Sequence, residues 1–93
     1  MIKSVWISPV ENQFNDNADV TVELEDGRTF SFTAFTPLNI TTQMRQENLT
    51  HFLCEDLLIL TAINEVNVRA AVTEMLEDEN IERFGIQSAP DAT

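Results

Sequence analysis

The stretch that decides the fold is residues 19–36, which read DVTVELEDGRTFSFTAFT. Valine and leucine alternate with polar residues before the Asp26-Gly27 pair, and phenylalanine and alanine alternate with serine and threonine after it. A period of two is the signature of a strand with one buried face. The stretch therefore predicts two antiparallel strands, 19–25 and 28–36, joined by a tight turn.

The length of that turn follows from the side-chain pattern. A two-residue loop would place the apolar rows of the two strands on opposite faces of the sheet. A three-residue loop, with Gly27 in the left-handed region as a bulge, places them on one face. We therefore predict a three-residue loop with Leu24 opposite Phe30 and Val22 opposite Phe32.

Further elements are expected on both sides of the hairpin. Before the hairpin we expect a strand over residues 2–8 and a loop over 11–17 that Phe14 packs onto the body of the protein. After the hairpin we expect a helix from Pro37 to about Glu47, capped by Thr36, and a buried central strand over 57–60. A second helix, capped by Asn64, follows with its apolar positions at Val68, Ala71, Val72, Met75 and Leu76. Trp6 falls on the face opposite Val5 and Ile7, so the first strand is expected to be covered on both sides.

Residues 81–86 fit either a last helical turn or a short edge strand, which Gly85 ends. The chain is thus predicted to be a single α+β domain over residues 1–86 with a frayed polar tail over 87–93. Its expected order is βββαβα, with a possible short C-terminal strand. An antiparallel sheet of about four strands, a meander of three and then one central strand, is expected to pack with two helices.

Composition limits the classes of partner. The chain has 93 residues, of which sixteen are acidic and five are basic, so its net charge is -11. This charge repels nucleic acid and anionic membranes and favours binding to basic proteins. The single cysteine, Cys54, cannot form an internal disulfide, and residues 1–9 lack the apolar core of a signal peptide. A cytoplasmic location is therefore expected, with neither direct nucleic-acid binding nor membrane association. The oligomeric state stays open.

Catalytic chemistry has little support in the sequence. His51, Cys54, Glu55 and Asp56 form the one cluster with nucleophilic or metal-ligating groups. One histidine and one cysteine do not supply the usual zinc ligands, nor a convincing nucleophile and base. The two glycines lie far apart and cannot form a phosphate-binding loop. No catalytic residue, cofactor or metal site is expected.

Two acidic groups are the candidate partner-binding residues. They are Glu23, Glu25 and Asp26 on the hairpin, and Glu74, Glu77, Asp78, Glu79 and Glu82 near the end of the last long helix. The hairpin acids also fit ordinary alternation of buried and solvent-facing residues. The helix-end acids oppose the helix dipole and repel one another, which favours a role in binding over one in stability. A merely solubilising surface is the alternative.

The chain resembles a known group of proteins through three segments. These are VTVELEDGRTFSFTAFTPLNI at 20–40, LLIL at 57–60 and EMLEDENIERF at 74–84. Their order is similar to that in small bacterial immunity proteins of contact-dependent inhibition and polymorphic toxin systems. The resemblance covers roughly residues 19–84 and rests on structural motifs.

The resemblance implies a cytoplasmic protein that binds a cognate toxin domain, often a nuclease, and blocks its active site. A basic nuclease groove would attract an acidic inhibitor, so the net charge agrees with this interpretation. An acidic regulatory module that mimics nucleic acid, unrelated to toxins, is the alternative. A small enzyme is a third possibility.

Overall fold

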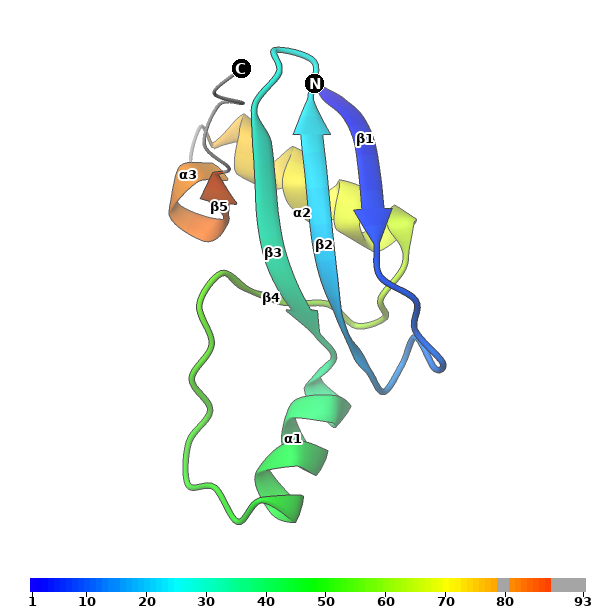
Figure 1. Cartoon of the computed structure of the whole chain (residues 1–93), viewed down its shortest axis with the longest axis vertical. Coiled ribbons are helices and arrows are strands. Elements are labelled where there is room, and N and C mark those ends of the chain that lie inside the picture. Colours follow the sequence, from blue (N-terminus) through cyan, green and yellow to red (C-terminus); the bar gives the residue numbers. More distant parts are fainter. Residues whose placement is uncertain (79–80, 88–93) are drawn as a thin grey trace, which may run out of the picture.

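A sheet and one long helix form the two layers of the fold (Figure 1). The computed structural model describes residues 1–78 and 81–87. Its elements are β1 (Ile2–Ile7), β2 (Asn17–Leu24), β3 (Thr29–Phe35), α1 (Pro37–Gln46), β4 (Leu57–Ile59), α2 (Glu65–Glu77), α3 (Ile81–Phe84) and β5 (Ile86–Gln87). The predicted α+β class and the βββαβα order are confirmed. The ambiguous residues 81–86 supply both a helical turn and the start of a short strand.

The sheet is mixed, with the strand order β1-β2-β3-β4. β5 also pairs with β3, at residues 30–31, whereas β4 pairs with residues 33–35. All pairs are antiparallel except β3 with β4, which is parallel. The prediction that residues 57–60 form a central strand of an antiparallel sheet is therefore wrong in position and direction. Leu58 is buried but Ile59 is 54% exposed, so β4 is an edge strand with one covered face. A short apolar run does not reveal the direction of its strand.

The hairpin turn has the predicted length. Gly27 adopts a φ of 93°, its N–H donates to the Leu24 carbonyl at 3.0 Å, and the Leu24 N–H donates to the Arg28 carbonyl at 2.8 Å. These bonds enclose residues 25–27 as a three-residue loop in which Gly27 forms the bulge. The left-handed conformation predicted for Gly27 is confirmed.

The predicted pairing of the hairpin strands is wrong by two residues. Val22 lies opposite Phe30, and Val20 lies opposite Phe32. The sequence pattern leads to this error because a shift of two residues keeps every side chain on the same face. The loop begins one residue earlier than expected, and the buried face is unchanged.

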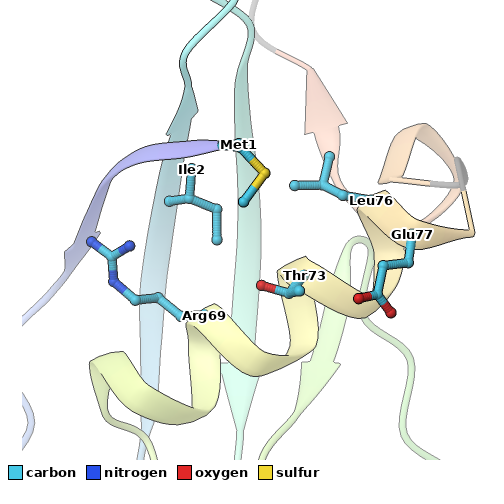
Figure 2. A pocket seen from close by; sticks show the side chains of 6 residues that line it. All are labelled: Met1, Ile2, Arg69, Thr73, Leu76 and Glu77. Atoms are coloured by element: carbon cyan, nitrogen blue, oxygen red, sulfur yellow. The ribbon is translucent and has the colours of Figure 1, made fainter.

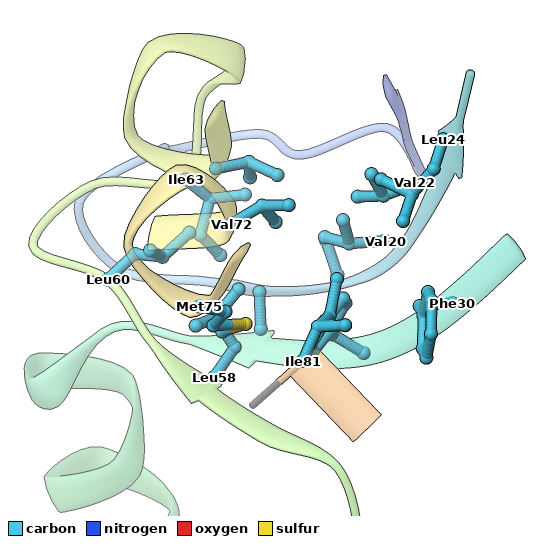
Figure 3. Close-up of a cluster of buried hydrophobic side chains, with 14 residues drawn as sticks. Val20, Val22, Leu24, Phe30, Leu58, Leu60, Ile63, Val72, Met75 and Ile81 are labelled. Atoms are coloured by element: carbon cyan, nitrogen blue, oxygen red, sulfur yellow. The ribbon is translucent and has the colours of Figure 1, made fainter. Parts of the chain in front are cut away.

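The core lies between the sheet and α2 (Figure 3). The covered face of β2 and β3 is fully apolar, and α2 contributes Val68, Val72 and Met75 to the same cluster. The Asn64 side chain caps α2 by accepting a hydrogen bond from the Asn67 N–H at 2.8 Å. The predicted helix, its cap and its buried stripe are confirmed.

Two predictions of apolar contacts are wrong. β1 is an edge strand, and Trp6 is 56% exposed because no helix in the described part of the chain covers that face of the sheet. Phe14 is also exposed. Gln13 attaches the loop instead: its carbonyl accepts the Ile63 N–H at 2.8 Å, and its side chain bonds Asn64 at 2.9 Å.

Helix α1 extends from one end of the sheet (Figure 1), and all of its residues keep part of their surface exposed. Thr36 caps it, as predicted, by accepting the Asn39 N–H at 3.2 Å.

The predicted frayed tail begins at Gln87, but the structure places this residue in β5, where it pairs with Phe30 of β3. Residues 88–93 of the predicted tail and the predicted site residue Glu79 lie outside the described residues.

Candidate protein-binding site

A surface groove runs between the edge strand β4, the second half of α2 and α3. Its volume is about 340 Å³, and the residues that line it are Leu58, Ile59, Ala71, Glu74, Met75, Asp78 and Phe84. Two large apolar residues that line this groove are open to solvent: Ile59 is 54% exposed and Phe84 is 48% exposed. Exposed apolar surface rimmed by polar groups is typical of a protein-binding site.

Two carboxylates give the groove its charge. Glu74 and Asp78 are four residues apart, so they lie on one side of the helix end. The four ion pairs in the described ranges join Lys3 to Glu23, Arg28 to Asp26 and to Glu82, and Arg69 to Glu65. Neither Glu74 nor Asp78 takes part in them. The groove therefore presents two carboxylates that form no ion pair within the described chain.

Arg28 links one residue of each predicted acidic group, Asp26 on the hairpin and Glu82 on α3. Its guanidinium contacts Asp26 at 2.9 Å and Glu82 at 3.2 Å, which ties the hairpin tip to α3. Hydrogen bonding of the Arg28 backbone N–H lowers the pKa of Asp26, and the Arg28 side chain lowers it further. Asp26 and Glu82 are thus partly neutralised within the molecule and have less charge to offer a partner than Glu74 and Asp78.

The remaining predicted acids lie apart from the groove. Glu23 contacts Lys3 at 3.6 Å on the uncovered face of the sheet, and Glu25 is exposed in the hairpin turn. Glu77 lies on another side of α2, in a hollow of about 350 Å³ that it forms with Met1, Ile2, Arg69, Thr73 and Leu76 (Figure 2). Arg69, which lines the same hollow, pairs with Glu65 at 2.9 Å.

In the sequence cluster at residues 51–56, His51 and Cys54 form hydrogen bonds to separate neighbours. His51 Nδ1 shares a hydrogen bond with Thr50 Oγ1 at 2.9 Å, whereas the Cys54 thiol donates to the Glu55 carbonyl at 3.2 Å. Burial raises the pKa of Asp56, and a hydrogen bond from Thr33 partly offsets this effect. Within residues 1–78 and 81–87, no group of three His, Cys, Asp or Glu side chains could hold a metal ion.

The apolar members of the groove were not predicted as site residues. Ile59 belongs to an apolar run that predicts a fully buried strand. Phe84 follows the main helix in a segment that the sequence pattern fits equally to a helical turn or a strand. β4 lies at the edge of the sheet, and there Ile59 lines the same groove as Phe84. The signal available in the sequence was a large aromatic residue close to a run of acidic residues.

Two findings complete the description of the molecule. None of the helices that the structure describes has the length and apolar character needed to cross a membrane. Searches of protein-family models, curated proteins and solved structures give no match to this chain.

Proposed function

We propose that this protein is an immunity protein that binds a basic toxin domain, of the nuclease type, and blocks its active site. The observation that carries the proposal is the groove between β4, α2 and α3. It is lined by the exposed apolar residues Ile59 and Phe84 and by Glu74 and Asp78, whose carboxylates have no ion-pair partner in the described chain. The resemblance of the sequence to immunity proteins supports the identity of the partner.

The groove offers two kinds of contact to such a partner. An apolar side chain of the toxin would cover Ile59 and Phe84, and neighbouring lysine or arginine side chains would pair with Glu74 and Asp78. Desolvated charge pairs at the centre of an interface contribute more to affinity than pairs at its rim. A net charge of -11 would speed association with a positively charged nuclease groove. Inhibition of this kind requires occlusion and no chemical step.

The partner to test is the toxin domain encoded by the gene directly upstream, because immunity genes are expected to follow their toxin genes. Co-expression should protect cells from that domain and yield a complex on purification. The groove variant is Glu74→Gln/Asp78→Asn, and Glu11→Gln/Glu47→Gln is its control. Both raise the net charge by two, but the control acids are exposed and lie outside the groove.

The dissociation constants of the two variants distinguish the groove from net charge alone. The groove variant should bind at least tenfold more weakly, a loss of about 1.4 kcal/mol. The control should change affinity less than about threefold, because exposed rim charges contribute little. Equal losses would reject the groove as the binding site. A wild-type protein that neither binds nor protects would reject the toxin, and groove-dependent binding of another basic protein would favour the regulatory alternative.

A further inference from the structure

One face of the sheet has no covering layer in the described structure. Helix α2 packs behind the sheet in Figure 1, so that view looks onto the uncovered side. There β2 and β3 present small polar side chains, among them Thr21, Thr29, Ser31 and Thr33, none of which is fully buried. We call this surface the open face.

A row of four side chains crosses the open face. Trp6 on β1 pairs with Thr21 on β2, Thr21 pairs with Ser31 on β3, and Ser31 pairs with Ile86 on β5. Directly paired residues of antiparallel strands share a face. The ends of the row are large and exposed, Trp6 at 56% and Ile86 at 49%. The two central side chains are small, so the row forms a shallow trough with apolar rims.

The width of this trough matches one α-helix. Three strand spacings of about 4.8 Å separate Trp6 from Ile86, which gives about 14 Å. An α-helix with its side chains is roughly 10–12 Å across. On the opposite face α2, together with Ile81 of the short helix α3, supplies the helical side of the core. A second helix on the open face would complete a three-layer arrangement.

Acidic side chains flank the trough and indicate the charge of its occupant. The pairing of Asp19 with Thr33 and of Glu23 with Thr29 places one carboxylate on either side of the central row. Lys3 contacts Glu23 at 3.6 Å and offsets one of the two. A second copy of this chain would bring the same carboxylates together, which disfavours a face-to-face dimer.

We propose that the open face docks an amphipathic, basic α-helix of the partner protein. Apolar residues of that helix contact Trp6 and Ile86, and its lysine or arginine side chains reach Asp19 and Glu23. The inference rests on the proposed function in taking the partner to be basic. It concerns a different surface, because the groove lies along β4, whereas Trp6 is on the strand at the other edge of the sheet.

Trp6 provides a direct probe of this surface. The protein contains one tryptophan and no tyrosine, so fluorescence excited in the indole band reports on the open face alone. The probe is a synthetic 18-residue helix of Leu, Ala and Lys with one apolar side. Its controls are a scrambled peptide of the same composition and a peptide with Glu in place of Lys. Binding is measured in parallel by calorimetry.

The amphipathic basic peptide should shift Trp6 emission to shorter wavelength and reduce acrylamide quenching about twofold or more, since apolar contact covers the exposed indole. The two control peptides should leave emission unchanged. Thr21→Lys, which places a cation in the centre of the trough, should weaken peptide binding at least tenfold. Thr73→Lys makes the same charge change on the exposed surface of α2 and should have little effect.

Several results would reject the inference. They are no peptide binding at millimolar concentration, binding without a change in Trp6 emission, or equal weakening by Thr21→Lys and Thr73→Lys. A blue shift that depends on protein concentration alone would identify a second copy as the occupant. If Glu74→Gln/Asp78→Asn weakens toxin binding but the toxin leaves Trp6 emission unchanged, the groove proposal stands and the open-face proposal fails.

Discussion

Gly85 joins α3 to β5, and the substitution Gly85→Ala tests how tightly that junction fits the core. A Cβ atom at position 85 would lie 2.7 Å from both Cε1 and Cζ of Phe32, and 3.2 Å from Cε2. Carbon atoms in ordinary contact are about 3.5–4.0 Å apart. Phe32 is 1% exposed, so its ring is enclosed by the core and cannot move away without displacing its neighbours.

Overpacking of this kind typically destabilises a protein by about 1–3 kcal/mol. We expect a loss in that range for Gly85→Ala, measured as the free energy of unfolding in urea. For a domain of this size the melting temperature should fall by about 4–8 °C for each kcal/mol.

A double-mutant cycle with Phe32→Leu identifies the contact responsible. Leucine lacks the ring atoms that the new Cβ would approach, so Gly85→Ala should cost at least about 0.5 kcal/mol less in the Phe32→Leu background. Gly27→Ala is the control, since a Cβ at Gly27 meets nothing within 4 Å. Its effect should be the same in both backgrounds. An equal loss from Gly85→Ala with and without Phe32→Leu would refute the close contact.

Three further outcomes follow from the fold. Gly27→Val should cost about 1–3 kcal/mol because φ is 93°; an unchanged urea midpoint would contradict the bulged turn. Thr36→Ala should cost about 0.5–2 kcal/mol through loss of the α1 cap, with faster amide exchange at Asn39; unchanged exchange would argue against capping. Burial raises the pKa of Asp56, so its ionised form opposes folding above that pKa, and Asp56→Asn should raise the urea midpoint at pH 7. This gain should vanish below the ordinary pKa of 3.8; a gain of equal size at pH 3 would assign it to another cause.

The sequence predicts those parts of the fold that depend on local patterns. The loop length at Gly27 follows from the requirement that two apolar rows share a face, and the cap at Asn64 precedes a regular helical stripe. The strand pairing does not follow, because alternation repeats every two residues. The edge position of β4 depends on a long connection and on partners distant in sequence.

The candidate site was predictable only in its charge. Four-residue spacing places Glu74 and Asp78 together on any helix, so their grouping follows from the sequence. Their separation from Glu82 does not, because it depends on the contact between Glu82 and Arg28. The exposure of Ile59 and Phe84 depends on where the sheet ends.

The parallel pairing of β4 also affects the order in which the chain folds. The β2–β3 hairpin closes over a three-residue turn, whereas β4 reaches β3 only after the intervening residues 36–56 have been brought back. Closing the longer connection costs more chain entropy, and non-local pairings generally form more slowly. We therefore expect the hairpin to form early and β4 to dock late, so that the groove wall is among the last parts of the protein to become ordered.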